Sequence, residues 1–493
     1  MNVTVALSQH LREHPMLTRL STSLLGLLFL LPSSGLASPT IEFFGGSSTM
    51  NALTPRILST GPESAYFNAA LLPRLDPQFT LGIFLFSEQS DITLNPRPQG
   101  VDVSPDIYEA SVDGETPYHH PLPTDQLTPR PSKSETSTAE PFIDLGIVSH
   151  LLGDKLVFGF LARVPVAQFQ SMDSFFSDER EQYFSNTLHP ALRGDRLRML
   201  SLSMALAGNV TDWLSLGAGM SLSLNSTVKS KVFLPDALDQ ERVIVNSSLE
   251  VNANMSPHFS LLIRPSDAWS FTMGIKGSSG QDVETSNEII FWSTEGPRIQ
   301  EFTLSTGYQP MSIFVGADLV AWECDGDSLR VGAEAVWEHW ASYQNRHGES
   351  PLDAWKDVVA VALGTRYAFG RMSFSADARY QPSPVPDQVG KENYVDNDRI
   401  GIGTGFEAEL NVLGMKLYGG VHMQGQILLS RDTIKDPGAS KPVMDEFPDS
   451  SVNLFTDEPI PAAVGLQTNN PGYPGFSSGG FLFGAGVTLR TPL

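Results

Sequence analysis

The stretch LSLGAGMSLSLN, residues 214–225, decides the fold class of this chain. Leucine, alanine or methionine fills every even-numbered position, and serine, glycine or asparagine fills every odd-numbered one. Because successive side chains of a β-strand point to opposite faces, this period of two predicts a strand with one apolar and one small or polar face. Residues 196–208 end in the same alternation, and only a short turn segment, 209–212, separates the two stretches. Together they predict a tight antiparallel hairpin.

The alternation recurs along the chain and predicts about fourteen strands, an even number as bacterial barrels require. We expect them near residues 78–88, 141–150, 155–165, 196–208, 212–228, 248–264, 267–290, 299–322, 328–343, 357–369, 371–383, 398–411, 414–429 and 479–490. A soluble β-sandwich would show similar alternation, so the connections must decide. Six connections are only a few residues long and the others are long, which is typical of an antiparallel barrel threaded through a membrane. The predicted fold class is therefore an all-β transmembrane antiparallel β-barrel.

An export signal precedes the strands. Arg12 and Arg19 come before the apolar run 24–31, and Gly35 and Ala37 supply the small residues of a cleavage site. The run is shorter than the roughly 20 residues that a membrane helix needs, so residues 1–37 are predicted to be a cleaved signal peptide. No later apolar stretch approaches that length, and any membrane span must therefore consist of strands. We expect the protein in the outer membrane of a Gram-negative cell.

Charge and cysteine content narrow the possible partners. The net charge of −23 argues against a nucleic-acid partner, because phosphate binding needs a clustered basic surface. The single cysteine, Cys324, cannot form an internal disulfide. The adjacent His119 and His120 have no third ligand at a recognisable spacing, so neither a metal site nor a cofactor is predicted.

Residues 38–77 depart from the strand pattern. Small and turn-forming residues such as Gly45, Gly46, Gly61 and Pro62 are too frequent for a strand, yet the segment is too long for a tail. We expect it to form an N-terminal plug, or hatch. Residues 78–493 then form the barrel, with long extracellular loops at 89–140, 166–195 and 430–478.

The tryptophans lie close to predicted strand ends. Trp213 and Trp269 each open a strand after a turn, and five more lie near other ends: Trp292, Trp322, Trp337, Trp340 and Trp355. Amphipathic rings favour the two membrane interfaces, so this placement predicts two aromatic girdles.

Several short segments, in this order, resemble a known family. EFFGG at 42–46 and GPESAYFNAAL at 61–71 are similar to the hatch of the outer-membrane long-chain fatty-acid transporter family, the FadL/TodX type. The family's Asn-Pro-Ala signature reads Asn68-Ala69-Ala70 here, without the proline. DWLSLGAG at 212–219, SPVP at 383–386 and NYVDNDR at 393–399 also resemble recurrent family segments. The hatch residues carried over are Phe43, Phe44, Gly45, Gly46, Tyr66, Phe67 and Asn68.

The resemblance covers most of the mature chain and implies a function. It implies a fourteen-stranded barrel, plugged by the segment before the first strand, that takes up long-chain fatty acids or other hydrophobic small molecules. In the family, a kink in the third strand lets the ligand leave sideways into the membrane. Gly159 is the candidate kink here, because glycine weakens strand pairing; an ordinary small residue facing the lumen is the alternative.

The loop at 166–195 carries more apolar side chains than an exposed loop should. A ligand site is expected to be concave and mostly apolar, so we interpret these side chains as a capture groove. Packing of the loop over the barrel mouth is the alternative. The residues are Phe169, Met172, Phe175, Phe176, Tyr183, Phe184 and Leu188.

Four arginines are candidate contacts for a ligand carboxylate in the lumen, because guanidinium binds carboxylate through two parallel hydrogen bonds. They are Arg198, Arg330, Arg371 and Arg379. Pairing with interior acidic residues such as Glu334, Glu338 and Asp377 is the alternative.

No serine and histidine have a spacing that indicates a catalytic dyad, so an enzyme is not predicted. The sequence favours a monomeric outer-membrane transport protein, surrounded by outer-membrane lipid, whose partner is a hydrophobic small molecule. A structural, adhesive or lipid-modifying outer-membrane barrel is the alternative.

Overall fold

The structure is a computed structural model that describes most of the chain after the predicted signal peptide. The described residues are 39–46, 50–102, 130–153, 155–166, 188–193, 197, 200–234, 244–291, 298–345, 348–452, 457–461 and 463–493. The predicted signal peptide 1–37 and the pair His119 and His120 lie outside them.

Strands make up most of the described chain. They are β1 (Gln78–Leu94), β2 (Lys133–His150), β3 (Val157–Pro165), β4 (Ser201–Thr211), β5 (Leu214–Leu234), β6 (Ile244–Ile263), β7 (Trp269–Lys276), β8 (Ser279–Phe291), β9 (Arg298–Gln309), β10 (Ser312–Cys324), β11 (Asp327–Glu338), β12 (Val358–Phe369), β13 (Met372–Gln381), β14 (Arg399–Val412), β15 (Met415–Ile434) and β16 (Gly475–Pro492). Short helices precede them: α3 (Pro39–Phe44), α4 (Pro55–Leu58), α5 (Ser64–Phe67) and the 3-10 helix η1 (Ala69–Arg74).

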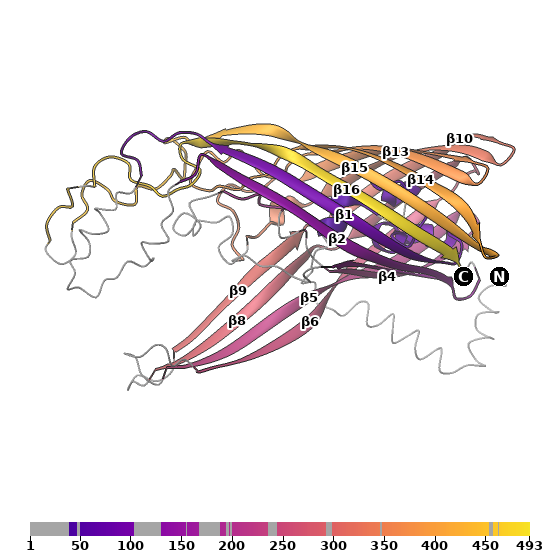
Figure 1. Cartoon of the computed structure of the whole chain (residues 1–493), viewed down its shortest axis with the longest axis horizontal. Helices are drawn as coiled ribbons and strands as arrows, with labels where there is room; N and C mark the ends of the chain where they lie inside the picture. The colour runs from indigo at the N-terminus through magenta and orange to yellow at the C-terminus, as the bar shows by residue number, and fades with distance from the viewer. Residues whose placement is uncertain are drawn as a thin grey trace. The chain divides into compact units, whose positions relative to one another are not determined.

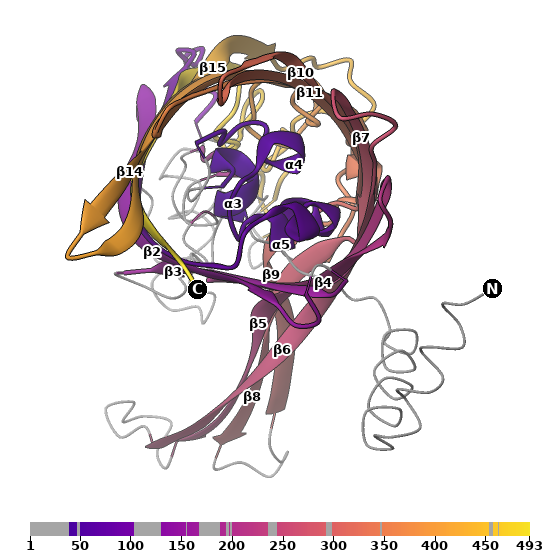
Figure 2. The ribbon, with the colours of Figure 1, turned by 90° about the vertical axis from the view of Figure 1, so that its right-hand side faces the viewer.

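Fourteen of the described strands form a closed antiparallel ring (Figure 2). The ring runs β1-β2-β3-β4-β5-β6-β7-β10-β11-β12-β13-β14-β15-β16 and closes through β16 onto β1, where Gln78 pairs with Pro492. Closure leaves the ring without an unpaired edge, which is what a strand-built membrane span requires. The predicted β-barrel of fourteen strands is confirmed.

The short connections gather at one end of the ring. They include the turns at 212–213, 325–326, 370–371 and 413–414, and the ring's first and last residues meet at the same end. Figure 1 shows long connections at the opposite end. This alternation is the one expected from the sequence.

Two predicted strands are each broken in two. The predicted strand 267–290 is β7 followed by β8, and 299–322 is β9 followed by β10. Pro310 lies at the second break, where its missing N–H cannot contribute to a ladder. β8 then pairs in parallel with residues 226–234 of β5 and carries β9 on its other side. β5, β6, β8 and β9 thus form an extension that runs away from the ring (Figures 1 and 2).

The ring is apolar outside and polar inside, as β7 illustrates. Trp269, Phe271, Met273 and Ile275 face outward and are 42–46% exposed, whereas the alternate residues Ser270 to Lys276 are buried. A soluble sandwich would bury the apolar face instead. The outer surface is therefore suited to lipid. No helix in the described part of the chain is long and apolar enough to cross a membrane.

Two predicted loop boundaries are wrong. β1 continues to Leu94 and β2 begins at Lys133, so the loop expected at 89–140 is confined to 95–132. β15 continues to Ile434 and β16 begins at Gly475, so the loop expected at 430–478 is also shorter. Ladder hydrogen bonds join backbones whatever the side chains, so pairing extends into polar sequence that lacks the alternation.

The tryptophan prediction holds for three of the six described tryptophans, and Trp337 of β11 is half-buried and stacks on His339. Trp213, Trp269 and Trp322 are 42–52% exposed near the short-turn end, as one girdle requires. Trp340 and Trp355 are instead buried in an aromatic cluster at the long-loop end. The position of a tryptophan near a strand end does not show whether its indole faces lipid or packs inside the barrel mouth. Trp292 lies outside the described residues.

Candidate functional site

Residues 39–46 and 50–75, here called the interior segment, lie inside the ring of strands, where Figure 2 shows α3, α4 and α5. Every residue of α4 and α5 is buried, and so are Ala69 to Pro73 of η1. Too short to be stable in isolation, these helices depend on the surrounding wall for their structure. The predicted hatch residues all lie in this interior segment.

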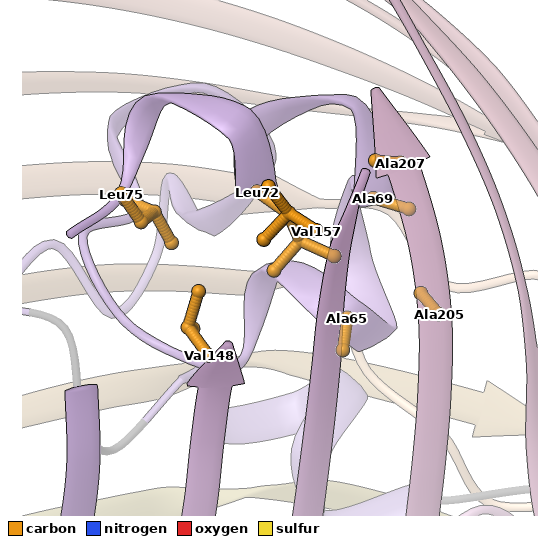
Figure 3. Close-up of a cluster of buried hydrophobic side chains, with 8 residues drawn as sticks. All are labelled: Ala65, Ala69, Leu72, Leu75, Val148, Val157, Ala205 and Ala207. Atoms are coloured by element: carbon orange, nitrogen blue, oxygen red, sulfur yellow. The ribbon is translucent and has the colours of Figure 1, made fainter. Parts of the chain in front are cut away.

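Small side chains on both surfaces let this segment approach the wall closely. Ala65, Ala69, Leu72 and Leu75 of the segment form one buried cluster with Val148, Val157, Ala205 and Ala207 of β2, β3 and β4 (Figure 3). At Gly217 of β5, a Cβ atom would lie 2.5 Å from the backbone of Ala69 and Ala70. Here the wall needs glycine for space rather than for its backbone freedom.

A buried charge network joins the segment to the wall at β7 and β11. The Glu42 carboxylate lies 2.9 Å from Arg56 and 3.0 Å from Lys276 of β7. Arg56 also pairs with Glu334 of β11 at 3.3 Å, and its backbone N–H donates to the same carboxylate. Removing one member of such a network leaves a buried charge without its partner, which is strongly destabilising.

Uncharged hydrogen bonds add to this attachment. The Asn68 amide of the altered family signature donates to the Arg56 carbonyl at 2.7 Å and to Thr272 at 2.8 Å. The Asp377 carboxylate of β13 accepts from Asn51 at 2.8 Å and from Thr54 at 2.7 Å. The segment is thus tied to strands on different sides of the ring.

A small enclosed cavity, the upper pocket, lies between this segment and the long-loop end. Its volume is about 30 Å³, about the volume of one water molecule in the liquid. The residues that line it are Glu42, Phe43, Leu192, Tyr308, Gln309, Glu338, Trp340, Arg379, Gln381, Pro384, Asp396 and Arg399. Aromatic rings and arginines therefore face the same space.

The two arginines of the upper pocket have no carboxylate within ion-pair distance among the described residues. The Arg399 guanidinium lies 3.8 Å from the centre of the Phe43 ring, and its Nη1 is buried without a hydrogen-bond partner. Arg379 donates to Gln381 at 3.0 Å. The nearby Glu338 is occupied by Trp340 Nε1 and Gln381. The pocket therefore combines two arginines, neither in an ion pair, with the Glu338 carboxylate, which has no cationic ion-pair partner among the described residues, beside aromatic surface.

An aromatic cluster adjoins the upper pocket at the mouth. Tyr343 and Trp355 stack with their ring centres 3.7 Å apart, and Trp340 and Tyr394 pack against them. Leu192 and Phe43 contact the same cluster, so apolar surface continues from the loops to the interior segment.

The predicted capture residues lie mostly outside the described part of the chain. Those outside are Phe169, Met172, Phe175, Phe176, Tyr183 and Phe184. Leu188 is buried with Ile92, Leu94, Val395 and Phe476 at the barrel mouth, so this residue packs rather than lining an open groove. The capture groove stays a prediction.

The end of this loop is held by a buried arginine. The Arg193 guanidinium is fully buried and lies 3.2 Å from Glu88 of β1 and 3.3 Å from Asp396. Sequence reasoning missed it, because its partners come from distant parts of the chain.

Gly159 of β3 lies in an unbroken ladder. It pairs with Val148 on one side and Ala205 on the other, and no register shift interrupts either pairing. A Cβ atom here would lie 2.7 Å from the Leu72 side chain, so this glycine makes room for the interior segment. The kink stays a prediction that this geometry does not require.

The four predicted carboxylate contacts do not form one site. Arg379 lines the upper pocket, whereas Arg330 lies near the short-turn end, paired with Asp318. Arg371 is exposed in the turn between β12 and β13 and so is not a lumen residue. One residue of slippage at a strand end reverses the face that a side chain occupies. Arg198 lies outside the described residues.

A serine motif in β16 lacks the local structure of a nucleophile elbow. GFSSG at 475–479 has the Gly-x-Ser-x-Gly spacing of a nucleophile elbow, which is a strand-to-helix turn. Its central serine, Ser477, lies instead in β16, where it is paired with Thr93 of β1 and Asp432 of β15.

Comparisons with known proteins give structural matches only. No protein-family model and no curated protein matches the chain. Three solved structures align over nearly their whole length. A Pseudomonas aeruginosa FadL homologue is 14% identical, covers 94% of this chain and 98% of its own, and has a TM-score of 0.46. The P. putida toluene transporter TodX is 10% identical, with 91% and 99% covered and a TM-score of 0.43. The Ralstonia pickettii toluene transporter TbuX is 11% identical, with 93% and 99% covered and a TM-score of 0.43.

Proposed function

We propose that this protein is an outer-membrane transporter that passes a hydrophobic carboxylate, such as a long-chain fatty acid, through a plugged barrel. The observation that carries the proposal is the upper pocket, where Arg379 and Arg399 face aromatic rings above the interior segment and form no ion pair among the described residues, although the Glu338 carboxylate lines the same pocket. A guanidinium pair matches a carboxylate, and the rings match the adjoining apolar chain.

The outer surface supports the membrane part of the proposal. An apolar groove of about 690 Å³ on the outside of β4 to β7 and β10 continues this surface, with Leu216, Phe259, Met273 and Ile275 among its lining residues. We assign the groove to outer-membrane lipid, because its side chains face away from the lumen. By the same logic the short turns face the periplasm and the long loops face outward.

The interior segment supports the gating part. It occupies the lumen, is buried throughout its helices and is attached by both charged and neutral contacts. A water-filled porin has no need of such a segment. We propose that it is a plug, and that the upper pocket, at about 30 Å³, must widen before a ligand is held there.

Uptake of a fluorescent long-chain fatty acid into cells that lack their own transporter tests the proposal. We expect uptake with the wild-type protein and at least a tenfold loss with Arg379→Gln combined with Arg399→Gln, since each hydrogen bond to a charged group contributes about 1.5–3 kcal/mol. Arg371→Gln, which removes an exposed arginine, is the matched control.

Uptake no greater than in cells without the protein, from a barrel shown to be folded by its anomalous gel migration before boiling, would reject the proposal. Equal uptake by the double variant and the wild type would keep the transporter and reject the upper pocket as the carboxylate site.

A further inference from the structure

A second cavity, the lower pocket, lies at the opposite end of the lumen, near the short turns. Its volume is about 220 Å³. Arg330 of β11 and Arg366 of β12 line its wall close to the turns at 325–326 and 370–371, and Arg74 of η1 faces it from the interior segment. Ile57, Leu58 and Leu71 supply an aliphatic side. The upper pocket has none of these residues, so the two cavities are separate.

Arginines outnumber carboxylates around the lower pocket. Arg330 and Arg74 share one carboxylate, Asp318, with Arg74 at 3.9 Å. Arg366 shares Glu407, at 3.6 Å, with Arg490, which is closer at 2.7 Å. Farther out, Arg264 adds positive charge near Arg74, and Glu63 adds negative charge near Arg366. The local balance is therefore positive.

Part of the donor capacity of these arginines is unused. Arg330 Nε and Arg366 Nη1 are buried and have no hydrogen-bond partner. The Arg366 side chain is 15% exposed, and its contact with Ser373 is long, at 3.4 Å. Buried donors without partners cost free energy, so an acceptor arriving in this pocket would be stabilised.

The arginines and the aliphatic side of the lower pocket together match the carboxylate end of an amphiphilic molecule. A carboxylate would accept hydrogen bonds from Arg330 and Arg366, while the first methylenes of its chain would pack against Leu58 and Leu71. A short hydrophilic anion would use the arginines but leave the aliphatic side empty.

We propose that the lower pocket is a second carboxylate-binding site, at the short-turn end of the lumen, for the same kind of amphiphilic ligand. This inference rests on the proposed function.

Titration of the full-length protein, in a nonionic detergent, with a fluorescent long-chain fatty acid and with the corresponding fatty alcohol tests the inference. We expect two binding sites for the acid in the wild type. Arg330→Gln with Arg366→Gln should weaken one of them about ten- to a hundredfold and change alcohol binding little. Arg371→Gln, at the same end but outside the pocket, should bind like the wild type.

Ala368→Phe provides a second variant that keeps every arginine, since Ala368 lines the lower pocket and a phenyl ring would fill part of it. It should abolish the same site even if the double arginine variant fails to fold. Two intact sites in a folded Ala368→Phe protein would overturn the inference.

Other outcomes separate the two proposals. A wild type that binds no acid would reject the proposed function. A single site, lost in Arg379→Gln with Arg399→Gln but kept in the lower-pocket variants, would leave the proposed function standing and reject the second site. Competition by acetate as effective as that by the long-chain acid would show a simple anion site and also overturn the inference.

Discussion

Glu42 and Lys276 form a buried ion pair with a 3.0 Å separation between the carboxylate oxygen and Nζ. One residue belongs to the interior segment and the other to β7 of the wall. The ion pair therefore attaches the interior segment to the wall at β7. Arg56, which also pairs with Glu42, attaches the segment to β11.

Glu42→Gln should loosen the interior segment while the ring persists. The change leaves Lys276 and part of Arg56 without their carboxylate, which typically costs about 3–5 kcal/mol for a buried pair. We expect open-channel current in planar bilayers where the wild type gives little. Glu409→Gln is the control, because Glu409 pairs with Lys416, whose side chain is 52% exposed and remains solvated when the carboxylate is removed. Wild-type current in Glu42→Gln would show that this pair does not hold the segment.

Gly217→Val should destabilise the barrel. Its Cβ would overlap the backbone of Ala69 and Ala70, and overpacking of this kind costs about 1–3 kcal/mol. The temperature at which the folded gel band disappears should fall. The neighbouring Ala218→Val points outward and should leave that temperature nearly unchanged. Equal effects of the two changes would contradict close contact between segment and wall.

Leu363→Arg tests the lipid-facing surface. Leu363 lies in the middle of β12 and is 62% exposed, so the arginine would face the hydrocarbon core. We expect the free energy of unfolding in lipid vesicles to fall by about 2–4 kcal/mol. Leu413→Arg, in the turn between β14 and β15, should cost at most about 1 kcal/mol. If the two variants were equally stable, this face would not be embedded.

Lys435 should make the packing of the outer loops depend on pH. Burial lowers the pKa of Lys435 to about 7, although Glu392 and Asp353 favour its charged form. Below pH 7 both folded and unfolded states are protonated, and the full cost of burying the ammonium is present. Between pH 7 and the ordinary lysine pKa only the unfolded state holds the proton, so stability rises with pH. Hydrogen-exchange protection around Gln388 should increase roughly tenfold from pH 6 to pH 8.

Lys435→Met should remove this pH dependence. The methionine side chain keeps the apolar packing of the lysine. It cannot donate the hydrogen bond that Lys435 Nζ makes to the Gln388 carbonyl at 2.8 Å. A protection profile that still rises in the variant would assign the effect to another group.

Phe175→Ser with Phe176→Ser tests the predicted capture groove. If these side chains bind ligand outside the barrel, uptake of the fluorescent fatty acid should fall several-fold while the folded gel band remains. Met444→Ser, an exposed apolar residue of another outer loop, is the control. Unchanged uptake by the double variant would contradict the predicted capture groove.

Strand alternation made the ring predictable, because along its strands the residues facing the outside are mostly apolar and those facing the lumen are mostly small or polar. In β7 and β12, exposed and buried side chains alternate along most of the strand, so the sequence alone predicts which residues face outward and which face the lumen. The loop boundaries were less predictable, since β1 and β2 pair beyond the alternating region.

The sites were less predictable because they are assembled from distant segments. Nothing around Arg399 in the sequence indicates the Phe43 ring beneath its guanidinium, and nothing around Arg366 indicates Arg74. Arg371 shows the converse, since a residue on the expected inner face is exposed at a turn. Local pattern predicts which face a residue occupies, whereas charge partners depend on the closed ring.

The seam between β1 and β16 has a consequence for biogenesis. It joins the first ring strand to the last, with Gln78 opposite Pro492, so the ring cannot close before β16 has been synthesised. Pairing across so large a sequence separation is intrinsically slow. Residues 39–46 and 50–75 precede β1 in the chain, yet they lie inside the lumen. The open sheet must therefore curl around them, and a sequence that delays their compaction would slow membrane insertion without weakening the finished barrel.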